Sequence, residues 1–197
     1  MPQGKQAKLL TPKQETAVLH HIQTRRYTAR DRVMFLLSVK AGLRAKEIAA
    51  LTWSMVTDAE GQVAEVIALE NRASKGKGGG RIIPLNATLR AACVALHAVQ
   101  YTHAHADRPL IASERGGPLT ASSVTKWFFN LYHSLGMTGC SSHSGRRTFI
   151  TRAARKVSEV GGSVRDVQQL AGHASLQTTQ RYIDGDTDAQ RKLVQLI

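Results

Sequence analysis

The sequence predicts a mainly helical α+β domain that carries a small three-stranded antiparallel sheet. Most of the chain places apolar residues at helical spacing, whereas residues 52–85 contain three short runs rich in branched side chains, TWSMV, VAEVIAL and RIIPL. The connectors TDAEGQ and SKGKGGG separate these runs as hairpin loops would. With 197 residues, 42% of them hydrophobic, the chain can bury the core of one compact domain.

Local signals place the first helices. Thr11, Pro12 and Gln14 give a capping-box pattern at the start of TPKQETAVLHHI. A second helix through ARDRVMFLLSVKA is expected to stop at Gly42, and a short helix restarts in RAKEIAAL. Arg44 is therefore expected at a helix start, directly after a glycine turn.

Helical spacing returns after the predicted sheet, in ATLRAACVALHAV and TASSVTKWFFNLYHSL. In the second of these, Val124, Trp127, Phe128 and Leu131 share one stripe, which we interpret as core in preference to a nucleotide-stacking surface. Further helices are expected in SHSGRRTFITRAARK, SVRDVQQLAG and SLQTTQRYI, the last two with serine caps. An amphipathic segment, AQRKLVQLI, closes the sequence.

The chain is strongly basic. It has 27 Lys and Arg residues against 14 Asp and Glu, a formal charge of +13 that attracts polyanions. Nucleic acid is the commonest acidic partner for such a domain, although a ribosomal or membrane-surface protein would share this charge. Charge alone therefore selects a class of partner and no activity.

Cysteine content argues against a disulfide-rich or zinc-binding protein, and hydropathy argues against a secreted or membrane-spanning one. The two cysteines, Cys93 and Cys140, are too few and too poorly spaced for a disulfide framework or a zinc site. The opening residues MPQGKQAKLL lack the apolar core of a signal peptide, and no apolar run is long enough to span a bilayer. We expect a soluble protein of the reducing cytoplasm.

Six polar residues form a candidate chemical set of two arginines, two histidines, a lysine and a tyrosine: Arg44, Lys75, His143, Arg146, His173 and Tyr182. The spacing of three near a helix start puts His143 and Arg146 on one face, where both can reach one phosphate. No acidic pair that would hold a metal accompanies the set, so we expect neither metal nor cofactor.

The set suits metal-free attack on a phosphodiester. A tyrosine hydroxyl is a weak nucleophile that needs a base or a cationic surround. Two arginines can clamp the non-bridging oxygens in the transition state, and a lysine near the leaving oxygen can protonate it. Each residue alone also has a structural interpretation, as a solvated or capping arginine, a helix-terminal histidine or a packing tyrosine. Lys77 competes with Lys75 for the role in the basic loop.

Four motifs together resemble a known family. AGLRAKEIAAL, SKGKGGGRIIPL, HSGRRTFITR and LAGHASLQTTQRY occur in the order and approximate spacing of the tyrosine recombinases, also called phage integrases, which share their catalytic architecture with type IB topoisomerases. The resemblance covers roughly residues 10 to 185 and implies the catalytic-domain fold of that family. Glu47, three residues after Arg44, matches an acid that the family often keeps there, and a helix-stabilising surface charge is the alternative interpretation.

The resemblance implies a role for each of the six residues. Arg44 and Arg146 would clamp the phosphate, Lys75 would be the general acid for the 5′ oxygen, His143 would assist proton movement at the attacking hydroxyl, His173 would bind and orient the phosphate, and Tyr182 would be the nucleophile.

The sequence departs from the family pattern in three places. Gly145 stands where a larger apolar residue is common, which we expect to loosen the packing of its helix. The hairpin is one residue longer than usual between its lysine and Arg81. Only about ten residues precede the catalytic motifs, so we expect a short form without the amino-terminal core-binding domain, like the fimbrial phase-variation invertases, or else a fragment.

The expected organisation has three parts: a disordered tail over residues 1–9, the catalytic domain over residues 10–185, and a carboxy-terminal tail over residues 186–197. In the family, a terminal helix past the tyrosine packs into a neighbouring subunit. KLVQLI offers four apolar side chains for such docking in trans, Leu193, Val194, Leu196 and Ile197. Packing of these side chains on their own subunit is the alternative.

The expected function is a nucleoid-associated, site-specific DNA recombinase that acts through a covalent 3′-phosphotyrosine intermediate. Its expected partners are double-stranded DNA with a recombination site, further copies in a tetramer, and accessory DNA-bending proteins. A family member that only binds DNA and a type IB topoisomerase-like enzyme are the alternatives. Candidate DNA-contacting residues outside the catalytic set are Lys77, Arg81, Lys126, Arg147, Arg152 and Arg165.

Overall fold

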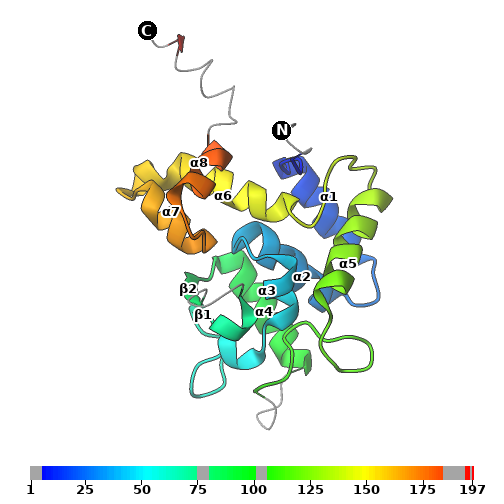
Figure 1. Cartoon of the computed structure of the whole chain (residues 1–197). Coiled ribbons are helices and arrows are strands. Elements are labelled where there is room, and N and C mark those ends of the chain that lie inside the picture. Colours follow the sequence, from blue (N-terminus) through cyan, green and yellow to red (C-terminus); the bar gives the residue numbers. More distant parts are fainter. Residues whose placement is uncertain (1–5, 75–79, 101–105, 184–193, 196) are drawn as a thin grey trace.

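The computed structural model describes residues 6–74, 80–100, 106–183, 194–195 and 197, and over these ranges it is mainly helical (Figure 1). Its α-helices are α1 Pro12–Gln23, α2 Thr28–Lys40, α3 Ala45–Ala50, α4 Ala87–Gln100, α5 Ala121–Ser134, α6 Ser144–Lys156, α7 Val164–Ala171 and α8 Leu176–Ile183. Three short 3₁₀ helices, η1 Trp53–Met55, η2 Asn71–Ala73 and η4 Val157–Val160, connect them.

The helix starts follow the local signals in the sequence. Thr11 accepts a hydrogen bond from the backbone N–H of Gln14, whose side chain bonds back to Thr11, so the predicted capping box is confirmed. Ser163 and Asp166 form a second capping box at the start of α7. Such contacts are between near neighbours in the chain, which is why composition and spacing reveal them.

The sheet has two strands among the described residues, so the prediction of three was wrong. Strand β1 Val66–Leu69 pairs antiparallel with β2 Arg81–Pro84. The run TWSMV instead forms η1, because its backbone pairs elsewhere: the Trp53 N–H donates to the Arg108 carbonyl at 3.1 Å, and the Leu110 N–H donates to the Leu51 carbonyl at 2.8 Å. Val56, at the end of this run, is buried without the run forming a strand.

Helix α2 lies at the centre of the main hydrophobic core. It contacts α1, α3, α4 and α6, and the consecutive residues 33–37 are all fully buried. Helix α5 covers part of this core with Val124, Phe128 and Leu131, which are also fully buried, while Trp127 is partly buried. The apolar stripe of α5 is therefore core, as predicted.

A second, much smaller hydrophobic cluster joins α6, α7 and α8. Its fully buried members are Ile150, Val167 and Ala171, with Phe149 and Tyr182 among the partly buried residues against it. In Figure 1, α7 and α8 (orange) lie beside α6 (yellow), away from α4 and α5. Two of the candidate residues, His173 after α7 and Tyr182 on α8, therefore lie in the part of the domain that packs on this small cluster.

Gly145 allows α6 to lie directly against α2, in contrast to the expected loose packing. A Cβ atom at this position would lie 2.3 Å from Ser38 Oγ and 2.9 Å from Val39 Cγ1. Two helices approach this closely only where no side chain stands between their backbones. The glycine therefore tightens the contact that positions the next residue, Arg146.

The described residues 6–9 lie along the domain, which differs from the disordered tail expected for residues 1–9. The Lys8 N–H donates to the Gly139 carbonyl at 3.0 Å, and the Ala7 carbonyl accepts from Arg147 at 2.6 Å. Residues 1–5 and 184–193 are outside the described ranges, as are the predicted hairpin lysines Lys75 and Lys77. Among the described residues, no helix has the length and apolar character needed to cross a bilayer.

Candidate active site

Arg146 is fixed from the first turn of α6. Its side chain is buried, and it donates to two backbone carbonyls, Gly42 at 2.6 Å and Ala171 at 2.7 Å. Burial, and next the positive charge of Arg44, lower the pKa of this guanidinium to about 10. It therefore remains charged at neutral pH, and both of its amino groups are already held by the protein.

Arg44 is held at the start of α3 by Glu47. The Arg44 backbone N–H donates to Glu47 Oε2 at 2.8 Å, and its guanidinium bonds to Oε1 at 2.9 Å. A second amino group of Arg44 donates to the Gly172 carbonyl at 3.3 Å. The two predicted arginines thus reach the same turn, because Ala171 and Gly172 are adjacent.

Glu47 is a buried anion, so its interpretation as a surface charge was wrong. It is 1% exposed and forms ion pairs with both Arg44 and Arg81. Burial alone would raise the pKa of this carboxyl, but the hydrogen bonds and charge of Arg81, and then of Arg44, outweigh it and hold the pKa below its usual value. Glu47 is ionised and orients two cations at once.

His173 follows α7 immediately after the turn at Gly172. The ring is buried, and Nδ1 lies 2.9 Å from Thr179 Oγ1 on α8. Burial, together with the charges of Arg146 and then Arg44, lowers the pKa of His173 to about 4. The imidazole is therefore neutral at pH 7. One ring nitrogen carries a hydrogen and can donate a hydrogen bond, and the other can accept one.

Tyr182 lies on α8 with its ring over His173. The two ring centroids are 5.4 Å apart, and the planes are inclined by 22°. The Tyr182 carbonyl accepts a 3.4 Å hydrogen bond from Thr151 on α6. The half-buried ring also packs against the small cluster of α6 and α7. Tyr182 therefore lies next to His173 and lines the same cavity as Arg146.

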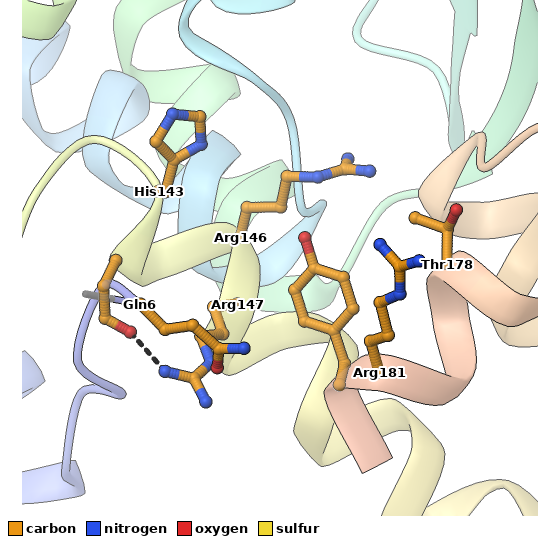
Figure 2. Close-up of a pocket in the computed structure, with 8 residues that line it drawn as sticks. Gln6, His143, Arg146, Arg147, Thr178 and Arg181 are labelled. Carbon is orange, nitrogen blue, oxygen red and sulfur yellow. Dashed lines mark hydrogen bonds between the residues drawn. The ribbon is translucent and has the colours of Figure 1, made fainter. Parts of the chain in front are cut away.

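A cavity of about 260 Å³ opens beside these groups. Figure 2 shows His143 at the start of α6, with Arg146 and Arg147 following it and Thr178 and Arg181 facing them from α8. The lining residues are Gln6, Ala7, His143, Arg146, Arg147, Thr178, Arg181 and Tyr182. His143 and Arg146 both line this cavity, and their joint action on one phosphate stays a prediction.

Three predicted DNA contacts are instead engaged with the protein. Arg81 is turned inward onto Glu47, Arg147 donates to the Ala7 carbonyl, and Arg152 pairs with Glu15. Their role as DNA contacts stays a prediction. Lys126 is exposed on α5, and Arg165 donates to the Gln168 side chain on the same helix.

Sequence reasoning missed several residues that shape the site. Thr179 bonds the ring of His173, and Thr178, Arg181 and Gln6 line the cavity. Thr178, Thr179 and Arg181 lie within the LQTTQRY stretch already noted for its tyrosine, so helical spacing from Tyr182 was the available signal. Gln6 has no such signal, because its position depends on a contact with a distant helix.

The assembled groups are suited to binding and transferring a phosphoryl group. Two fixed guanidiniums offer positive charge, a neutral imidazole offers proton transfer, and a tyrosine hydroxyl is a potential nucleophile. Among the described residues, no group of three or more His, Cys, Asp or Glu side chains is arranged to hold a metal ion. The fold and the site together define a candidate domain for phosphodiester chemistry.

The chain belongs to the phage integrase family, which it matches over residues 8–188. It is 30% identical over 160 residues to the tyrosine recombinase XerC of Brucella suis, a match that covers 81% of this chain and 47% of that protein. It is 34% identical over 162 residues to the XerC of Rhodospirillum centenum, covering 81% and 43% of the two proteins. The chain thus spans less than half the length of these two relatives.

A likeness of fold extends to solved structures. The Tn1549 transposon integrase in complex with circular intermediate DNA has a TM-score of 0.72 at 22% identity, with 99% of this chain and 68% of that chain covered. The XerA recombinase has a TM-score of 0.70 at 23% identity, with 100% and 66% covered. These structures confirm the mainly helical fold with a small antiparallel sheet, and the match over residues 8–188 confirms the predicted family.

Proposed function

We propose that this chain is the catalytic domain of a site-specific DNA recombinase that cleaves and rejoins DNA through a covalent 3′-phosphotyrosine intermediate on Tyr182. The observation that carries the proposal is the convergence of Arg44, Arg146 and neutral His173 on the turn before α8, with the Tyr182 ring stacked on the histidine. Relatives named tyrosine recombinases support it, as does the DNA complex formed by a protein of the same fold.

The reaction assigns one step to each group. The Tyr182 oxygen attacks phosphorus and loses its proton, with His143 assisting at the edge of the cavity, while the bond from phosphorus to the 5′ oxygen breaks. Arg44 and Arg146 bind the non-bridging oxygens, where charge gathers in the transition state, and His173 binds and orients the phosphate. The 5′ oxygen leaves with a proton from a general acid. We assign that role to Lys75, which lies outside the described residues.

Arg44 and Arg146 would stabilise the transition state well because their side chains are held in position before the reaction begins. Arg44 and Arg146 are bound by backbone carbonyls and by buried Glu47, so their charges need little reorganisation when the phosphate becomes trigonal bipyramidal. The phosphotyrosine bond retains the energy of the broken phosphodiester. Rejoining by a 5′ hydroxyl then needs no nucleotide cofactor.

The test is capture of the covalent intermediate. The protein is incubated with nicked suicide duplexes drawn from the DNA that flanks its own gene, and products are separated under denaturing conditions. We expect a denaturant-resistant protein–DNA adduct with the wild type and with the control Tyr27→Phe, whose tyrosine lies at the start of α2. We expect no adduct with Tyr182→Phe.

Each other result has a definite meaning. An adduct that persists in Tyr182→Phe refutes Tyr182 as the nucleophile. The absence of an adduct with every flanking duplex, combined with ordinary DNA binding, favours a binding module over an enzyme. Relaxation of supercoiled DNA by a monomer without a paired site favours the topoisomerase-like alternative.

We also propose that the protein assembles as a tetramer on DNA through its last residues. Val194 and Ile197 are 67% and 102% exposed, and apolar side chains this exposed favour docking on a second copy. Deleting residues 190–197 should weaken multi-subunit complexes on DNA, measured by native gel electrophoresis, and leave the melting temperature unchanged. Unchanged synapsis and cleavage contradict docking in trans, and a lower melting temperature favours packing on the same subunit.

A further inference from the structure

Three consecutive backbone carbonyls at the end of α7 each accept a hydrogen bond from a different arginine. The pairs are Arg81 Nε to Leu170 at 2.9 Å, Arg146 Nη2 to Ala171 at 2.7 Å, and Arg44 Nη2 to Gly172 at 3.3 Å. The next residue is His173. The two arginines and the histidine of the proposed mechanism are therefore aligned on one short piece of backbone, and Arg81 is the third arginine on it.

Arg81 binds on both sides. Its two terminal amino groups meet Glu47 in a two-pronged ion pair, Nη1 to Oε1 at 3.0 Å and Nη2 to Oε2 at 3.2 Å, while Nε is used by Leu170. Glu47 in turn holds Arg44. One rigid guanidinium thus connects α3, which Arg44 directly precedes, to the end of α7, two residues before His173.

The turn before His173 is built around Arg81. Gly172 has a φ of +60°, and a Cβ atom there would lie 2.7 Å from Arg81 Nη1. The glycine therefore meets both the backbone conformation and the close approach of the guanidinium. The Arg81 side chain is 9% exposed, which leaves little of it for a phosphate of DNA.

We propose that Arg81 is a positioning residue, which sets the distance between Arg44 and His173 without itself touching the substrate. The inference rests on the proposed recombinase function. Removing the guanidinium leaves Glu47 paired with Arg44 alone and leaves the Leu170 carbonyl without this donor. Arg44 and His173 are then no longer held at a fixed distance from each other. A misplacement of about 1 Å at a reacting centre lowers rates by about 100-fold.

The test compares two variants of Arg81 with a matched control. Arg81→Met removes the charge, and Arg81→Lys keeps the charge but cannot span Glu47 and Leu170 together. The control is Arg90→Met, because Arg90 on α4 also donates to two backbone carbonyls, Val63 and Ala64, and pairs with Glu65. All proteins are assayed at saturating suicide duplex, at a temperature where urea unfolding shows them folded.

We expect both Arg81 variants to cleave about 10- to 100-fold more slowly in a single turnover, and Arg90→Met to cleave like the wild type. The noncovalent Kd for the duplex and its dependence on salt should not change in any variant. The ¹⁵N chemical shifts of the His173 ring should move in the Arg81 variants and stay in place in Arg90→Met.

Several outcomes overturn the inference. Cleavage within about twofold of wild type in folded Arg81→Met rejects positioning. If the Arg81 variants bind DNA more weakly, with a shallower salt dependence, and cleave normally at saturation, then Arg81 contacts a phosphate. If Arg81→Met does not fold, Arg81→Lys decides in the same assay. If the wild type forms no adduct, the proposed function has failed. The positioning role is then judged from the ¹⁵N chemical shifts alone, and it is rejected if the His173 ring shifts do not change in the Arg81 variants.

Discussion

The arginine side and the tyrosine side of the site are held in different ways. The arginine side, Arg44, Glu47, Arg81 and Arg146, is fixed by ion pairs to one buried carboxylate and by hydrogen bonds to backbone carbonyls. The tyrosine side, α8 with Tyr182, rests on a cluster with three fully buried residues. Groups that stabilise charge are effective when they are already in place, whereas a nucleophile, the role proposed for Tyr182, must approach and leave its target.

Charge-bearing groups and the proposed nucleophile are thus held by separate parts of the domain with different amounts of buried packing. The helices of the tyrosine side bury few apolar side chains, which is the property of regions that open at low free energy. The arginine side joins α3, β2, α6 and the turn at Gly42 through side chains that are mostly buried. Three predictions test this contrast, from the largest effect to the smallest.

The largest effect is expected from Glu47→Ala. The change removes the carboxylate between Arg44 and Arg81 and leaves the inward-turned Arg81 without its anion. Loss of one partner from a buried ion pair costs about 3–5 kcal/mol, which urea unfolding would measure. The control is Glu70→Ala, because the Glu70–Arg72 pair is exposed and should contribute less than about 1 kcal/mol. Equal effects would show that the arginine side is not specially fixed.

A smaller effect is expected from acid. The pKa of folded His173 is about 4, below the unfolded value of about 6.5, so the unfolded chain binds more protons between these values and stability falls as pH falls. From pH 7 to pH 5 this histidine should remove about 2 kcal/mol from the free energy of unfolding.

The comparison for the acid experiment is His173→Asn, which should lose that part of the pH dependence. Glu47 also has a lowered pKa, and its contribution is lost as pH falls through that value, in the same direction. The difference between the wild type and the variant therefore isolates the histidine. Identical pH profiles would contradict a neutral, buried His173.

The smallest effect on stability is expected from Tyr182→Phe. Among the described residues, the Tyr182 hydroxyl has no hydrogen-bond partner, and the ring contact with His173 survives the loss of the oxygen. The free energy of unfolding should change by less than about 0.5 kcal/mol, measured by urea unfolding, although the same change should abolish the covalent adduct. A loss above about 1 kcal/mol would show that the hydroxyl holds the tyrosine side in place.

The sequence predicted what depends on neighbours in the chain and missed what depends on distant pairing. The helix caps at Thr11 and Ser163 follow from residues three positions away. The TWSMV run has strand-forming residues, but residues 108–110 determine its backbone conformation. Within the site, His143, Arg146, His173 and Tyr182 were predicted from two of the four motifs, HSGRRTFITR and LAGHASLQTTQRY.

Arg81 illustrates the limit of that reasoning. A basic residue beside a glycine-rich hairpin predicts a DNA contact, and its bonds within the protein could not be read from the sequence. Those partners are Glu47, 34 positions away, and Leu170, 89 positions away. The same holds for Gly145, whose contact with Ser38 on another helix reverses the packing expected from its size.

The end of α7 has one more consequence, for the sign of the electric field at the site. A helix carries a partial negative charge at its carboxyl end, which repels phosphate. Here three guanidiniums bind the last carbonyls, with one carboxylate among them. The positive groups outnumber the negative one, so the helix end presents a positive potential to an approaching anion. A backbone surface that ordinarily suits cations thereby becomes suited to an anion, which is what the proposed binding of a DNA phosphate requires.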